Sequence, residues 1–242
     1  LEPILAIKKC SQMLEDGADI IDIGASSSRP GASKVSANDE IARLSPVLKS
    51  IKSEFPKAIL SVDTYYSEVA KAAVDLGAHI INDISGGQMD EAMPKTIADL
   101  NVPYVLMHMQ GTPQTMQKKP EYQNVTMDVS RFLSQQMRIF LDAGANDIIL
   151  DPGFGFGKTL EHNYQLLNNL ENLTAFEKPI LVGFSRKSMI NKVLNSQAEN
   201  ALNGTSVLNT IALQKGADIL RVHDVREAKE AVKIVTFAQT HS

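Results

Sequence analysis

The fold follows from one stretch, Gly144-Ala145-Asn146-Asp147-Ile148-Ile149-Leu150-Asp151, because its pattern of Gly-Ala and an apolar run occurs four times along the chain. The other three copies begin at Gly17, Gly77 and Gly216, and each follows an amphipathic segment. A glycine that ends a helix, followed at once by an apolar run, is typical of a helix, a short loop and a buried strand. The repeat therefore predicts helices that alternate with strands.

Three further short apolar runs extend this alternation, over residues 58–62, 103–107 and 179–183. Ser36 predicts the capped start of a helix near residues 37–54. The strand runs are continuously apolar, as expected for strands whose two faces are both covered. Seven strands that alternate with helices predict an α/β fold with a parallel sheet.

The number of predicted strands bears on how the sheet closes. A closed (β/α)8 TIM barrel needs eight strands, and the length of 242 residues suits such a barrel as a single domain over residues 1–242. We therefore expect a (β/α)8 barrel whose first strand and loop lie upstream of Leu1, because a gap beside the strand near residue 20 would expose two strand edges. An open doubly wound sheet is the alternative.

Composition and charge exclude several classes of function. The net charge of −4 gives no general attraction to nucleic acid or to anionic membranes, so we expect neither as a partner. Cys10 is the only cysteine, which excludes an internal disulfide and a cysteine-based zinc site and favours a reducing, cytoplasmic location. The sequence has no apolar run of bilayer-spanning length.

Polar side chains follow the predicted strands, at the rim where barrel enzymes carry their chemistry. The hydrogen-bonding groups suit a flat heterocycle with amino, ring N–H and carbonyl groups, and the cationic groups suit an anion such as phosphate. The first set is Asp63, Asn82, Asp151 and Lys187, and the second is Arg29, Arg221 and His223. An internal salt bridge, such as Asp63 or Asp151 with Lys187 in the empty barrel, is the alternative for each.

Two familiar motifs are absent. The segment Gly153-Phe154-Gly155-Phe156-Gly157-Lys158-Thr159 is similar to a P-loop, but Pro152 stands where the first glycine is required. His108 and His162 lack the spacing of an HExxH zinc site, and we expect no metal site built from this chain alone.

Taken together, seven strand-end segments resemble those of the dihydropteroate synthase family, which are pterin-binding (β/α)8 barrels. They are Asp22-Ile23-Gly24 through Ser28-Arg29-Pro30-Gly31-Ala32, Ser61-Val62-Asp63-Thr64, Ile81-Asn82-Asp83-Ile84-Ser85-Gly86-Gly87, Leu106-Met107-His108-Met109-Gln110-Gly111, Leu150-Asp151-Pro152-Gly153-Phe154-Gly155-Phe156-Gly157-Lys158, Gly183-Phe184-Ser185-Arg186-Lys187-Ser188 and Arg221-Val222-His223-Asp224. The match covers essentially the whole chain.

The resemblance implies that 6-hydroxymethyl-7,8-dihydropterin diphosphate condenses with p-aminobenzoate to give dihydropteroate and diphosphate. It implies four sets of site residues, of which some residues belong to more than one. These are Asp63, Asn82, Asp151, Lys187 and Arg221 for the pterin; Ser28, Arg29, Arg221 and His223 for the diphosphate; Pro30, Phe156 and Ser188 for p-aminobenzoate; and Asp63, Asp151, Lys187, Arg221 and His223 for catalysis.

Further expectations also rest on the resemblance. It implies Mg²⁺ as a cofactor, with an Asn in the first loop upstream of Leu1 helping to bind the diphosphate and the metal, and it implies a homodimer. Two rival functions remain, a pterin-dependent methyltransferase domain and a non-catalytic pterin-binding paralogue. The methyltransferase has no need of the cations Arg29, Arg221 and His223 as a diphosphate clamp.

Overall fold

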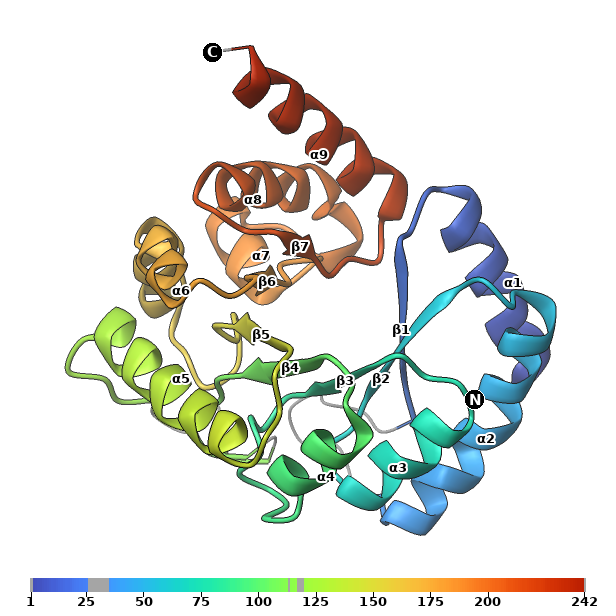
Figure 1. The fold of residues 1–242 in the computed structure, drawn as a ribbon. Helices are drawn as coiled ribbons and strands as arrows, with labels where there is room; N and C mark the ends of the chain where they lie inside the picture. The colour runs from blue at the N-terminus through green and yellow to red at the C-terminus, as the bar shows by residue number, and fades with distance from the viewer. Residues whose placement is uncertain (1, 26–34, 113, 117–119, 242) are drawn as a thin grey trace.

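The computed structural model describes residues 2–25, 35–112, 114–116 and 120–241, in which helices and strands alternate (Figure 1). The strands are β1 (Ile20–Gly24), β2 (Ile59–Asp63), β3 (Ile80–Asp83), β4 (Tyr104–Met107), β5 (Ile148–Asp151), β6 (Leu181–Val182) and β7 (Ile219–Leu220). The α-helices are α1 (Pro3–Glu15), α2 (Ala37–Glu54), α3 (Ser67–Asp75), α4 (Met93–Leu100), α5 (Val125–Asp142), α6 (Leu160–Asn168), α7 (Ser188–Leu194), α8 (Leu202–Gln214) and α9 (Val225–Thr240). Two 3₁₀ helices, η1 (Leu170–Phe176) and η2 (Ala198–Asn200), complete the order.

The helix ends explain the repeated Gly-Ala pattern. Gly17, Gly77, Gly144 and Gly216 all have φ between 92° and 100°, a left-handed conformation that glycine adopts without steric cost. Each reverses the chain after a helix and leads into the next strand, as the repeat predicts. At the other end of a helix, the Ser36 side chain accepts a hydrogen bond from the Asp39 backbone N–H and caps α2 as expected.

The strands are parallel and follow one another in sequence order. β1 to β5 form one sheet in the order β1-β2-β3-β4-β5, and β6 pairs with β7. A single parallel bridge between Leu150 and Ile180 joins the two parts. The helices form an outer ring around the strands in Figure 1. Sequential order with all helices outside is the arrangement of a barrel and differs from a doubly wound sheet, which has helices on both faces.

An apolar cluster marks the inside of this curved sheet. Its members come from six different strands, and they include Ile20 at one edge of the sheet and Ile219 at the other. The full set is Ile80, Val105 and Leu181, with Ile20, Ile149 and Ile219 packed against them. Side chains from many strands that meet in one interior layer are typical of the packed core of a barrel. The polar groups of the site lie next to this layer, toward the carboxyl ends of the strands.

β1 and β7 are edge strands. Among the described residues, β1 pairs with β2 alone and β7 with β6 alone. The Lys229 ammonium of α9 nevertheless contacts the Asp19 carboxylate beside β1, at 2.7 Å, so an ion pair links the two edges. An additional strand between them stays a prediction. None of the described helices is long and apolar enough to cross a membrane.

Candidate active site

Four polar residues lie two positions beyond members of the apolar cluster, on the same strands or directly after them. They are Asp22, Asn82, Asp151 and Arg221, which follow Ile20, Ile80, Ile149 and Ile219. Because side chains alternate along a strand, residues two apart share a face. The alternation therefore brings all four side chains into a second interior layer, nearer the carboxyl ends of the strands.

Asp151 is the most deeply buried member of this layer, with 1% of its surface exposed. Its Oδ2 accepts a hydrogen bond from Nη2 of Arg221 at 2.9 Å, and its Oδ1 accepts one from the Gly153 backbone N–H at 2.7 Å. A buried carboxylate is stable only when it is paired in this way. Arg221 and the Gly153 N–H together therefore fix the orientation of both oxygens.

The network continues from Arg221 across the barrel. Nη1 of Arg221 donates to the Asn82 side-chain oxygen at 3.4 Å, and Nδ2 of Asn82 donates to Oδ2 of Asp22 at 2.9 Å. These bonds orient the Asn82 amide, which is 2% exposed. Burial pulls the pKa of Arg221 down, but Asp151, Asp22 and Asp63 outweigh it and raise the pKa above its usual value. Arg221 therefore stays cationic beside these three acidic side chains.

Asp63 ends β2 beside Asn82 in the strand register. No described residue donates a hydrogen bond to its carboxylate. Burial and the neighbouring Asp22 carboxylate raise the pKa of Asp63 to about 8, against the opposing effect of Arg221. A carboxyl group with unused acceptors inside a polar cavity is suited to binding a ligand that brings N–H donors.

Lys187 precedes α7 and contacts the loop after β5. Its Nζ donates to the Phe154 carbonyl and lies 5.0 Å from the centre of the Phe156 ring. Burial and the Arg221 charge lower the pKa of Lys187 to about 7. The alternative of an internal salt bridge is confirmed for Asp151 and Arg221, which pair with each other. Lys187 is not the partner, because no ion pair among the described residues joins it to Asp63 or Asp151.

A cavity of about 580 Å³ adjoins these groups. Asn82 and Asp151 are not among its lining residues and are joined to it through hydrogen bonds with Arg221. Asp63, Lys187, Arg221, His223 and Phe156 all line it. The cavity also reaches between the edges of the sheet, where its walls come from α1, β1, β7 and α9. An opening of this size accommodates a ligand of two linked rings with a charged group.

The remaining predicted site residues are Ser188, His223 and three residues that the structure does not describe. Ser188 is exposed at the start of α7 and is not among the residues that line the cavity. Ser28, Arg29 and Pro30 lie outside the described residues. His223 is exposed, and its backbone N–H donates to Oγ of Ser185 at 3.1 Å.

The structure adds two features that the sequence analysis did not assign to the site. Asp22 lines the cavity and orients Asn82. Lys158 is 4% exposed, and its Nζ donates to the carbonyls of Gly153 at 2.9 Å and Phe156 at 3.1 Å and contacts Nδ1 of His108 at 2.9 Å. Lys158 therefore organises the loop that presents Phe156 and does not serve as a P-loop lysine.

A metal site built from protein side chains alone is not found in the part of the chain that the structure describes. No group of three or more His, Cys, Asp or Glu side chains there could hold a metal ion. Four cationic side chains line the cavity, Lys9, Lys187, Arg221 and Lys229, and they suit an anionic ligand.

Comparisons with known proteins agree with this geometry. A family model described as "Pterin binding enzyme" matches residues 2–223. A dihydropteroate synthase of Escherichia coli K12 is 44% identical over 232 residues, which are 95% of this chain and 82% of that protein. The Yersinia pestis dihydropteroate synthase, solved with a sulfonamide drug complex, is 42% identical with a TM-score of 0.95, over 99% of this chain and 87% of that one.

A further solved relative carries a ligand that bears on the second substrate. The Xanthomonas albilineans dihydropteroate synthase with 4-aminobenzoic acid is 37% identical with a TM-score of 0.91, over 98% of this chain and 85% of that chain. The chain therefore belongs to the family of pterin-binding enzymes. Within that family it is a transferase of the dihydropteroate synthase type, an enzyme of folate biosynthesis.

Proposed function

We propose that the cavity binds 6-hydroxymethyl-7,8-dihydropterin diphosphate with its ring against the polar layer and condenses it with p-aminobenzoate. The observation that carries this proposal is the connected set of Asp22, Asn82, Asp151 and Arg221, in which fixed acceptors lie beside a cation. Asp63 and Asp151 accept the amino and ring N–H groups of the pterin, and Lys187 donates to its carbonyl. Asn82 completes the ring contacts.

The proposed reaction places opposite charges at the two ends of the bond that breaks. The bond between the pterin methylene and the diphosphate oxygen breaks, the amine nitrogen forms the new bond to the methylene carbon, and the amine proton leaves to water. Negative charge develops on the departing diphosphate, where Arg221 and His223 stabilise it together with Ser28 and Arg29. Positive charge develops on the methylene, where the negative charge of the Asp151 carboxylate stabilises it. An aromatic amine is nucleophilic enough to need no activated serine or cysteine.

Phe156 provides the apolar wall for p-aminobenzoate in this proposal, and Pro30 and Ser188 are proposed to contact the same substrate. Phe156 lines the cavity, and the Lys187 ammonium lies 5.0 Å from the centre of its ring. The relative from Xanthomonas albilineans with 4-aminobenzoic acid supports a site for this second substrate.

Mg²⁺ belongs to the proposal as an ion that accompanies the diphosphate. Magnesium commonly takes most of its ligands from substrate phosphates and water. The described residues offer no group of three acidic, His or Cys ligands. We expect chelation to reduce turnover and to leave the binding of free pterin unchanged.

A homodimer is the proposed assembly, with a second copy covering α7 to α9. Five apolar residues on these consecutive helices are between 50% and 70% exposed, namely Val193, Leu194, Val207, Ile234 and Phe237. Sedimentation should show a dimer that Ile234→Glu weakens and that Met127→Glu, on α5, does not. A monomeric parent protein would contradict the proposal. We place the enzyme in the cytoplasm, because Cys10 is a buried free thiol.

Turnover tests the proposed function against its two rivals. The protein is incubated with the pterin diphosphate, p-aminobenzoate and Mg²⁺, and dihydropteroate and diphosphate are both quantified. One diphosphate for each dihydropteroate supports the proposal. Pterin binding without product indicates a non-catalytic pterin-binding protein. Methyl transfer from a methylated pterin, in place of condensation, indicates a methyltransferase domain.

A further inference from the structure

Arg186 lies in the loop before α7 and pairs with Asp224 in the loop before α9. Its side-chain hydrogen bonds to described residues are all with protein groups outside the two proposed substrate subsites. Its Nε and Nη2 donate to the two oxygens of Asp224, each at 2.9 Å, in a fork-to-fork ion pair. Its Nη1 donates to the carbonyls of Ala198 at 3.0 Å and Glu199 at 2.9 Å. All the side-chain nitrogens of Arg186 therefore bind protein.

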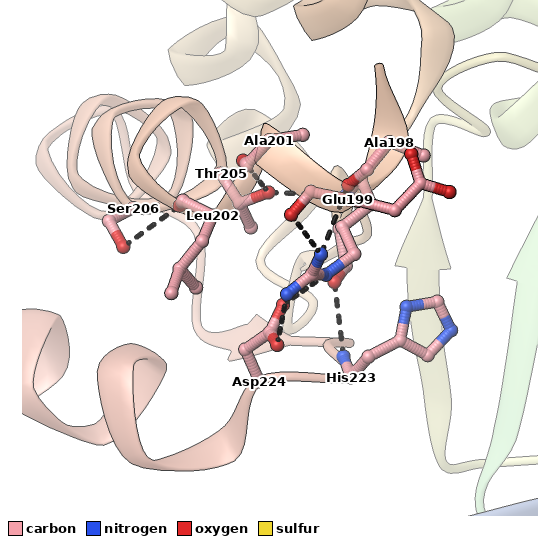
Figure 2. Close-up of polar contacts among 10 residues, drawn as sticks. Ala198, Glu199, Ala201, Leu202, Thr205, Ser206, His223 and Asp224 are labelled. Atoms are coloured by element: carbon pink, nitrogen blue, oxygen red, sulfur yellow. Dashed lines mark hydrogen bonds and ion pairs between the residues drawn. The ribbon is translucent and has the colours of Figure 1, made fainter.

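The backbone of Arg186 is held as firmly as its side chain. Its φ of 54° is left-handed, a conformation that residues other than glycine rarely adopt. Its N–H donates to Oγ of Thr205 at 3.1 Å, and this hydroxyl donates in turn to the Ala201 carbonyl. Figure 2 shows Thr205 on α8 and Ala201 at the N-cap of this helix. Asp224 lies on the opposite side of the dashed contacts.

The two ends of the ion pair each adjoin a proposed ligand group. Arg186 directly precedes Lys187, which we assign to the pterin, and Asp224 directly follows His223, which we assign to the diphosphate. A second contact, from the His223 backbone N–H to Oγ of Ser185, joins the same two loops. In Figure 2 the His223 ring extends away from Thr205 and Ser206 and to one side of the Asp224 contacts.

We propose that Arg186 is a positioning residue whose pairing with Asp224 fixes the distance between the pterin subsite and the diphosphate subsite. This inference rests on the proposed function. A ligand that spans both subsites gains affinity from the link between its two parts only when the subsites are held at the matching separation. Loss of the Arg186–Asp224 ion pair therefore reduces the extra affinity of the linked ligand more than it reduces the affinity of either part alone.

The experiment measures dissociation constants for free 6-hydroxymethylpterin and for the pterin diphosphate, with p-aminobenzoate left out. In Arg186→Ala we expect the ratio of the first constant to the second, which measures the affinity that the attached diphosphate adds, to fall by about tenfold or more. Asp224→Asn should act in the same direction, and the double variant should be no worse than Arg186→Ala, because the two residues form one unit. Arg186→Lys should rescue only partly, since an ammonium cannot form the fork.

A matched control separates positioning from stability. Lys215→Ala removes another ion pair between segments distant in the sequence, from Lys215 to Glu171, which adjoins no ligand group of the site. We expect it to lower the melting temperature and to leave the ratio within about twofold. If Arg186→Ala is poorly folded, Asp224→Asn and Arg186→Lys carry the same test.

The possible outcomes separate a failure of this inference from a failure of the proposed function. A parent protein that binds the pterin diphosphate no more tightly than free pterin overturns the proposed function. A parent protein that prefers the diphosphate, with a ratio unchanged in both Arg186→Ala and Asp224→Asn, overturns the positioning role alone. Equal loss of the ratio in Lys215→Ala also overturns it, because the effect would then follow stability.

Discussion

Nη2 of Arg221 lies 2.9 Å from Oδ2 of Asp151, and this ion pair joins the last strand of the barrel to the fifth. Asp151 is 1% exposed, whereas a quarter of the Arg221 side chain is open to the cavity. Arg221 therefore neutralises a buried carboxylate on one side and presents positive charge to a ligand on the other. The same cation serves the pterin and the diphosphate in the proposed reaction.

Removal of the carboxylate is expected to affect both folding and binding. Asp151→Ala should lower the free energy of unfolding by about 2–4 kcal/mol, because it strands a partly buried guanidinium. It should weaken pterin binding by about 2–4 kcal/mol through the loss of charge-assisted hydrogen bonds. Denaturant unfolding and calorimetry measure the two effects. Asp142→Ala, which breaks an exposed ion pair with Arg138, is the matched control. Unchanged pterin affinity in Asp151→Ala would remove Asp151 from the site.

Substitution of Arg221 should affect the binding of the diphosphate part of the substrate more than the binding of the pterin part. Arg221→Ala should weaken the binding of the pterin diphosphate by about tenfold or more relative to free pterin, because only the diphosphate loses a direct charge partner. Free pterin should lose some affinity as well, since Arg221 also orients Asn82. Arg221→Lys should recover only part of both, because a point charge replaces a planar fork. Competition binding provides the measurement, and equal losses for the two ligands would assign Arg221 to the pterin or the fold.

The raised pKa of Asp63 predicts a dependence of stability on pH. Burial lifts this pKa from its usual value to about 8, so between about pH 4 and pH 8 the folded state holds a proton that the unfolded state has released. The unfolded state binds fewer protons, and stability therefore falls as pH rises through this window. Asp63→Asn removes the titration, so its stability should decline less than that of the parent protein from pH 5 to pH 7, by about 1 kcal/mol or more. Parallel curves for the two proteins would show that Asp63 is ionised in the fold.

Lys158 should matter to the second substrate through the loop that it holds. Lys158→Met keeps the length of the side chain but leaves the Gly153 and Phe156 carbonyls without their donor, at a cost of about 2–4 kcal/mol in the free energy of unfolding. The KM for p-aminobenzoate should rise by about threefold or more, while the KM for the pterin diphosphate changes less. Lys95→Met, at an exposed ion pair on α4, is the control and should cost less than about 0.5 kcal/mol. Equal changes in both KM values would mean that Lys158 supports the whole site and not Phe156 alone.

Local patterns predicted most of the architecture because local physics determines it. The Gly-Ala repeat identified four helix ends, since only the left-handed glycine allows the chain to reverse there. The polar residues at the strand ends met at one rim because parallel strands deliver their carboxyl ends to the same side. Asp22 could have been assigned too. It stands two positions after Ile20, the same spacing that relates Asn82 to Ile80 and Asp151 to Ile149.

The partners of the charged groups could not be predicted in the same way. Asp151 pairs with Arg221, which is 70 positions away, and Arg186 pairs with Asp224, which is 38 positions away. Such choices depend on the exact separation of loops in three dimensions, and several cations compete for each carboxylate. Lys158 gave no signal because its role is to bind backbone carbonyls, which every residue possesses.

A structure of the protein with 6-hydroxymethylpterin bound tests the central claim most directly. The account predicts the pterin ring in the cavity, with its amino and ring N–H groups within hydrogen-bond distance of the Asp63 and Asp151 carboxylates and its carbonyl within reach of Lys187. A pterin bound elsewhere, or bound in the cavity without contact to either carboxylate, would contradict it.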